Sequence, residues 1–97
     1  MRDEIMDNEK IMFYSELRRI QDLAIGTSLS KQSDYKKIED VLEDVTYDII
    51  YMMCEMIDGY RNNSIKYRLV NEKSDSIVND GFTLHDWCEA YLRCSDV

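Results

Sequence analysis

One stretch of the chain, residues 34–58, constrains the fold most, because its apolar side chains recur every three or four residues. That spacing is typical of one face of a helix, and the recurring residues are Ile38, Val41, Leu42, Val45, Ile49, Met52, Met53 and Met56. Ser33 can cap the first turn, and Gly59 follows the last. The chain contains no proline that would stop a helix. We therefore expect a long helix over residues 34–58 that forms the spine of the fold.

The rest of the chain predicts three smaller elements. Residues 3–25 have helical periodicity, carried by Met6, Phe13, Leu17, Ile20 and Ala24, and Gly26 is the expected C-terminal cap. Residues 65–79 alternate apolar and polar side chains around the turn-forming sequence NEKSD, which predicts a β-hairpin.

The last predicted element is a helix over residues 84–94, capped by Thr83, which we expect to pack on the spine through Trp87 and Leu92. The predicted fold class is α+β and mainly helical. A length of 97 residues indicates a single small globular domain over residues 1–97.

The net charge limits the kinds of partner that the chain can bind. Twenty acidic and twelve basic residues give a formal charge of -8. Nucleic acids and anionic membrane surfaces repel such a chain, because both carry dense negative charge. We therefore expect no direct binding of nucleic acid and no membrane association. A basic protein partner is favoured through complementary potentials.

Cysteine usage and hydropathy bear on the compartment. The first ten residues, MRDEIMDNEK, lack the apolar core of a signal peptide, and no stretch approaches the length of a membrane span. Three cysteines at scattered positions make no disulfide framework. A cytoplasmic location is the expectation.

The sequence TLHDWCEAYLRC contains the only histidine of the chain, which raises the question of a metal or catalytic site. His85, Cys88 and Glu89 share one side of the predicted helix, but a structural zinc site needs four ligands and no Cys-x-x-Cys pair supplies the others. We expect His85 to face solvent near the helix start and Cys88 to act as a small apolar side chain. No catalytic residues, metal or cofactor are predicted, and the chain is not expected to be an enzyme.

Negative charge is concentrated on the predicted spine helix. Residues 31–58 carry eight acidic and three basic residues, and no basic residue lies between Lys37 and Arg61. At about 100° per residue, five carboxylates fall on the face away from Leu42. These are Asp40, Asp44, Asp48, Glu55 and Asp58. Either this acidic ridge is a solvated face, or it occupies a basic groove that otherwise binds a phosphate backbone.

An apolar flank lies beside the acidic ridge. Between residues 47 and 57 only Asp48 and Glu55 are charged, and Tyr47 and Tyr51 are the large aromatic side chains. A helix that is apolar around most of its circumference is either central to its fold or covered by another chain. Both a fully packed monomer and a homodimer or partner interface remain open.

These features favour a non-catalytic acidic interaction protein. The expected function is inhibition, of the immunity, antitoxin or phage anti-defence (anti-CRISPR) type, in which the chain mimics nucleic acid and blocks the phosphate-binding surface of a basic, nucleic-acid-acting protein. The partner-binding residues would be Asp40, Asp44, Tyr47, Asp48, Tyr51, Glu55 and Asp58. The alternative is a homo-oligomeric subunit, structural or binding a small ligand, with the spine helix at the protomer interface.

Overall fold

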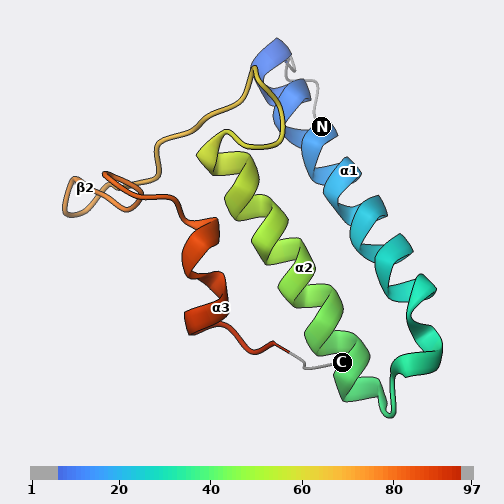
Figure 1. Cartoon of the computed structure of the whole chain (residues 1–97). Helices are drawn as coiled ribbons and strands as arrows, with labels where there is room; N and C mark the ends of the chain where they lie inside the picture. Colours follow the sequence, from blue (N-terminus) through green and yellow to red (C-terminus); the bar gives the residue numbers. More distant parts are fainter. Residues whose placement is uncertain (1–6, 95–97) are drawn as a thin grey trace.

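The computed structural model describes residues 7–94 and shows an α+β fold that is mainly helical (Figure 1). Two long antiparallel helices, α1 (Asn8–Ser30) and α2 (Ile38–Asp58), lie side by side, and a short helix α3 (Cys88–Tyr91) lies on the other side of α2. The hairpin of β1 (Val70–Asn71) and β2 (Ser76–Ile77) projects to the side. Short 3-10 turns, η1 (Gln32–Asp34) and η2 (His85–Trp87), precede α2 and α3. Among the described residues, no helix has the length and apolarity that crossing a membrane requires.

Helix α1 begins at Asn8 and ends at Ser30, whereas the predicted range is residues 3–25. The Asp7 carboxylate caps it by accepting a hydrogen bond from the Lys10 backbone N–H at 3.0 Å. The predicted start at residues 3–6, which includes Met6, lies outside the described residues. The prediction that Gly26 ends the helix is wrong, because α1 continues through it to Ser30. A mid-helix glycine costs only about 1 kcal/mol, and the continued turns bury Ser28 against the rest of the fold.

Helix α2 begins four residues later than predicted. Residues 32–34 form the separate turn η1, and Lys37 is extended with φ -154° and ψ 164°. Its predicted end is confirmed, because α2 stops at Asp58 and Gly59 adopts a left-handed conformation with φ 87°. A side chain is disfavoured at that φ, and the Lys66 side chain also packs where a Cβ on Gly59 would lie.

The hydrophobic core sits between α1, α2 and the segment that follows α2. Three side chains form its buried centre: Ile20 from α1, Met56 from α2 and Ile65. Partly buried side chains surround them, namely Met12, Phe13, Leu17, Ile49, Met52, Met53, Ile57 and Tyr67. The spine role of α2 is confirmed, since five of these eleven residues belong to it.

The predicted hairpin is present but much shorter than residues 65–79. Only Val70 pairs with Ile77 and Asn71 with Ser76, in antiparallel register. Residues 65–69 form no strand, and the Tyr67 N–H donates to the Ile57 carbonyl at the end of α2, at 2.9 Å. The Leu69 N–H donates to the Asn79 side chain, also at 2.9 Å.

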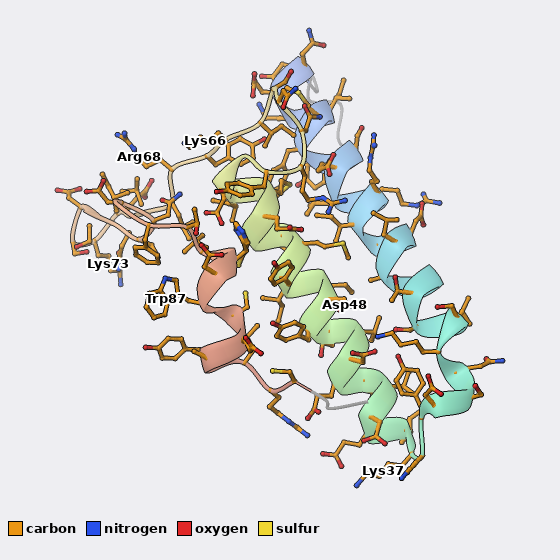
Figure 2. The ribbon with its side chains drawn as sticks, viewed as in Figure 1. Lys37, Asp48, Lys66, Arg68, Lys73 and Trp87 are labelled. Atoms are coloured by element: carbon orange, nitrogen blue, oxygen red, sulfur yellow. The ribbon has the colours of Figure 1, made fainter. Side chains whose placement is uncertain are left out.

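The C-terminal segment is correctly placed against α2 but turns a different face inward than the one predicted. Residues 84–94 contain η2 and the four-residue α3 rather than one helix. Trp87 is exposed, and its side chain projects away from α2 (Figure 2). His85 and Cys88 are buried in its place. The tighter 3-10 turn shifts the helical phase, which explains why a uniform helical period misplaces Trp87.

Two isoleucines of α1 test how much the small core contributes to stability. Ile20 is 1% exposed and Ile11 is 48% exposed. Ile20→Ala is expected to lower the free energy of unfolding by about 2–5 kcal/mol, because it removes buried methyl groups and leaves a cavity. Ile11→Ala is the matched control and should cost less than about 1 kcal/mol. Urea denaturation measures both, and equal losses would contradict this assignment of the core.

Candidate functional site

The buried Asp58 carboxylate, at the last residue of α2, positions the C-terminal segment. It accepts hydrogen bonds from the backbone N–H groups of Leu84 and His85, each at 2.9 Å. Its Oδ2 also lies 2.6 Å from Nδ1 of the His85 ring. One side chain therefore bonds two successive amides and an imidazole, which holds η2 at the end of α2.

These hydrogen bonds determine the charge state of Asp58. Burial alone would raise the pKa of this carboxyl, but the two backbone amides and the His85 ring outweigh burial and lower the pKa below its ordinary value. Asp58 is therefore a buried carboxylate at neutral pH. The expectation that His85 faces solvent is wrong, because the imidazole is buried as the partner of this carboxylate.

Beside this anchor, a hollow of about 500 Å³ lies between α2 and the C-terminal segment. Its lining combines acidic and aromatic side chains: Tyr47, Asp48, Tyr51, His85, Asp86 and Glu89. Three of the six come from α2 and three from η2 and α3. Among the described residues no lysine or arginine lines it. The acidic hollow, as defined by these six residues, is the candidate functional site.

Asp48 is the carboxylate of α2 least compensated by its surroundings. Burial raises its pKa, and the neighbouring Asp44 adds to that effect, while Lys31 opposes it from a distance. Among the contacts of the described residues, Asp48 has neither a hydrogen bond nor an ion pair. A partly desolvated carboxylate of this kind is stabilised by an incoming cation.

Two tyrosines form an aromatic wall of the hollow. The rings of Tyr47 and Tyr51 are stacked, with centroids 6.1 Å apart and an interplanar angle of 22°. The Tyr51 ring also meets His85 edge-on at 5.6 Å. Burial raises the pKa of both hydroxyls, and nearby acidic groups add to the effect, so both tyrosines are neutral at physiological pH. Neutral rings beside carboxylates offer both a stacking surface and charge to a cation.

The structure does not bring all seven predicted partner-binding residues to one surface. Tyr47, Asp48 and Tyr51 line the acidic hollow. Asp58 lies beneath it and is 5% exposed, so it is not a surface carboxylate. Asp40 is half-buried near the start of α2, where it accepts a hydrogen bond from the Lys36 backbone N–H at 3.3 Å.

The other two predicted residues take part in ion pairs within the fold. Asp44 is buried and accepts hydrogen bonds from the Tyr35 hydroxyl at 2.5 Å and from Lys31 Nζ at 3.3 Å. Glu55 lies 3.4 Å from the Arg61 guanidinium. The sequence-based picture of a ridge without nearby basic residues is therefore wrong, because Lys31 and Arg61 reach α2 from neighbouring segments.

Arg61 and Arg93 complete this charge compensation. The Arg61 Nε donates to the buried Glu16 of α1 at 3.0 Å, which ties α1 to the end of α2. Arg93 pairs with Glu39 at 2.5 Å and with Glu43 at 2.8 Å. After these pairings, Asp40 and Asp48 are the carboxylates of α2 without a basic side-chain partner among the described residues, and of the two only Asp48 lines the acidic hollow.

The arrangement at His85 invites comparison with a catalytic dyad. Asp58 holds Nδ1, and Nε2 lies 3.4 Å from the carboxylate of the exposed Asp86. The described lining of the hollow contains no serine, threonine or cysteine for this histidine to activate. Within residues 7–94, no three His, Cys, Asp or Glu side chains are grouped as metal ligands. The carboxylates and aromatic rings that line the hollow are groups that can bind a cation.

Sequence reasoning missed the partnership of Asp58 and His85 and the contribution of Asp86 and Glu89. His85, Asp86 and Glu89 lie 27 positions or more along the chain from the α2 residues that they meet. Helical periodicity relates residues within one helix, so it does not predict these contacts. A signal was present in Thr83, which was expected to cap a helix next to His85 and Asp86. The structure shows the Thr83 hydroxyl donating to the Asp86 carboxylate instead.

The Asp58 anchor predicts a specific dependence of stability on pH. Because the folded pKa of Asp58 is lowered, its contribution is present above the unfolded pKa of about 3.9 and is lost as the pH falls through the folded value. Asp58→Asn should lower the unfolding free energy by about 1.5–3 kcal/mol at pH 7 and flatten its acid dependence. Urea denaturation from pH 7 to 3 measures this. An acid dependence as steep as that of the wild type would refute the anchor, and Asp22→Asn is the exposed control.

Asp48 should give the opposite dependence of stability on pH from that of Asp58. Its folded pKa is raised, so ionisation opposes folding, and stability is lost as the pH rises from the unfolded to the folded pKa. Asp48→Asn is therefore expected to raise the unfolding free energy at pH 7 and to have little effect at pH 3, where the carboxyl is protonated. Asp22→Asn again serves as control, because a surface ion pair such as Asp22–Arg18 contributes at most about 1 kcal/mol. A destabilised Asp48→Asn protein at pH 7 would count against an uncompensated carboxylate.

Comparisons with known proteins add no information about this site. No family model, curated protein or solved structure matches the chain. The assignment of a function therefore rests on the acidic hollow and the surfaces around it.

Proposed function

We propose that this chain is a non-catalytic acidic interaction protein that acts in the cytoplasm by binding and inhibiting a basic, nucleic-acid-acting protein. The class is that of immunity proteins, antitoxins and phage anti-defence inhibitors. The observation that carries the proposal is the acidic hollow, in which Asp48, Asp86 and Glu89 surround two tyrosines. The net charge of -8 favours encounter with a basic surface.

The chemistry of the hollow matches an arginine side chain best. A guanidinium group is planar, stacks on aromatic rings and donates a fork of hydrogen bonds to a carboxylate. The stacked Tyr47 and Tyr51 rings supply the flat surface, and Asp48 supplies the acceptor. A bound guanidinium would also offset the cost of the partly desolvated Asp48 carboxylate.

The proposed target class follows from where exposed arginines gather. Proteins that act on nucleic acids bind phosphates with arginine and lysine side chains in accessible grooves. A chain that sequesters such an arginine blocks the groove. Asp44 and Glu55 are paired with basic residues within the fold. The chain therefore captures one or two basic side chains of its partner and does not imitate a long row of phosphates.

A second surface on the same segment supports a protein partner. Phe82, Trp87 and Tyr91 are exposed and line a shallow apolar hollow of about 470 Å³. Trp87 lies 6.2 Å from Phe82 and 6.5 Å from Tyr91 between ring centroids. Tryptophan and tyrosine are enriched among the residues that dominate binding energy at interfaces. Since Asp86 and Glu89 alternate with these aromatics along the chain, one partner can contact both surfaces.

Among the described basic residues, Lys31 acts on Asp48 from a distance, and its ammonium group is paired with Asp44. Arg68 and Lys73 lie on the loop and hairpin that project away from α2 and from Asp48 (Figure 2), whereas the Lys66 side chain packs beside Gly59 at the end of α2. Arg61 and Arg93 are paired with glutamates. The hollow is thus open to a cation from another molecule.

Affinity capture from the lysate of the host tests the proposal. The wild type should retain a basic nucleic-acid-acting protein, and the double variant Asp48→Asn, Glu89→Gln should lose it, because two carboxylates of the hollow are neutralised. Retention should weaken at high salt, since the screening length falls from about 10 Å at 0.1 M to about 3 Å at 1 M. Mass spectrometry identifies the retained protein, whose purified activity should be inhibited by equimolar wild type.

The matched control is Asp22→Asn, Glu72→Gln, which changes the net charge equally at exposed positions outside the hollow. It should retain the same partner as the wild type. If the two double variants behave alike, charge as such and not the hollow governs binding. Identical capture by all three proteins, insensitive to salt, would overturn the proposal.

A further inference from the structure

A second surface of α2 is apolar and lies open. Ile38 and Leu42 are 72% and 56% exposed, and on α1 Leu29 is 62% exposed. Ile25 of α1 and Ile50 of α2 are also exposed. Single exposed apolar residues are common on monomers, but contiguous patches mark interaction sites. We call these five residues the open apolar face.

The α1 part of the open apolar face borders on apolar side chains of α2. A hollow of about 340 Å³ joins Ile25 and Leu29 of α1 to Val41 and Val45 of α2. At about 100° per residue, Ile38, Leu42 and Ile50 fall within a sector of roughly 120° together with Ile49 and Met53. Of the charged residues of α2, only Glu39 falls in this sector, where Arg93 neutralises it.

The open apolar face and the acidic hollow lie on opposite sides of α2. Around the helix axis, Tyr47 and Tyr51 lie about 140° and 180° from Leu42, while Ile50 at the edge of the face lies about 60° from Tyr47. A basic partner at the hollow therefore leaves the apolar face exposed to water. A separate partner must therefore cover the apolar face. Binding of a cation at the acidic hollow does not depend on that partner.

The exposed area and the radius of gyration of the chain indicate how much surface a partner can bury. The chain exposes 7307 Å², whereas a folded monomer of this mass exposes about 5,800 Å². The radius of gyration is 15.7 Å, against about 12.5 Å for a domain of this length. The exposed area is therefore roughly 1,500 Å² larger than that of an average folded monomer of this mass. A stable interface needs about 800 Å² from each partner, so the excess can accommodate one.

Charge decides which partner fits. Two copies with a charge of -8 repel each other at most surfaces, and they can meet only where charge is absent. The open apolar face is such a place, whereas a basic partner is drawn to the acidic hollow. Two-fold symmetry places the same patch on both sides of the interface, so an apolar patch is self-complementary.

We propose that a second copy of this chain covers the open apolar face, so that the α1–α2 pairs of two protomers pack as a four-helix bundle. Each protomer by itself is one layer of helices, and its buried core centre has only three side chains. Domains normally enclose a core between two layers. The dimer supplies the second layer and converts the half-buried stripe of α2 into a true core, as in other four-helix bundles.

The solution mass of the purified full-length chain tests this proposal. Light scattering coupled to size exclusion should give twice the 11.6 kDa chain mass over a dilution series at micromolar concentrations. Leu42→Glu should raise the dimer dissociation constant by about tenfold or more, because an unpaired carboxylate would be buried in the interface. Circular dichroism should show unchanged helicity, since Leu42 is already half-exposed within one chain.

Controls separate the interface from effects on folding. Tyr91→Glu adds the same charge at an exposed α3 position outside the face and should remain dimeric. Leu29→Glu places the charge on α1 and should dissociate the dimer even if Leu42→Glu fails to fold. A wild type that has the mass of one chain, or of more than two, at every concentration overturns the proposal. So do Leu42→Glu and Leu29→Glu proteins that are as dimeric as the wild type. None of these results bears on capture by the acidic hollow.

Discussion

The bonds to the Asp58 carboxylate are the interaction on which the arrangement of the C-terminal half depends. Two amides and one imidazole converge on this side chain at the end of α2. These bonds hold the segment that follows the hairpin against the end of α2, and they fix the rotation of η2 there. That rotation turns Trp87 outward and brings Asp86 and Glu89 beside α2. The anchor thus lies beside the three residues, His85, Asp86 and Glu89, that the C-terminal segment contributes to the acidic hollow.

Ion pairs compensate for a small apolar core in this fold. Glu16 and Arg61 link α1 to the end of α2, while Asp44 binds Lys31 and Tyr35 at the opposite end of the helix pair. Such partly buried pairs are costly to break, because removing one partner leaves a desolvated charge. Together with the pairs made by Arg93, by Arg61 with Glu55 and by His85, the ion pairs of the fold engage five of the seven acidic residues of α2. The high net charge of the chain is therefore expressed at fewer places than its composition implies, and Asp48 is the clearest of them.

Helix α2 has two sides with different physical chemistry. One side carries Tyr47, Asp48 and Tyr51, which are suited to a cation. The other carries Ile38 and Leu42, which are suited to an apolar surface. The inhibitor and the homo-oligomer therefore do not exclude each other, because each proposal uses a different side. A dimer would present two acidic hollows on its outer surfaces.

Helical periodicity and charge in the sequence alone determined that α2 exists, where it ends, which of its sides is apolar and that the fold is mainly helical. They also selected Tyr47, Asp48 and Tyr51, because neighbours within one helix are related by a constant rotation per residue. Only the tertiary structure decided which carboxylates are free. Asp44, Glu55 and Asp58 are bound by residues from other segments, and His85 is buried as the partner of Asp58. Contacts between distant segments depend on how loops place them in space, and no local spacing records that placement.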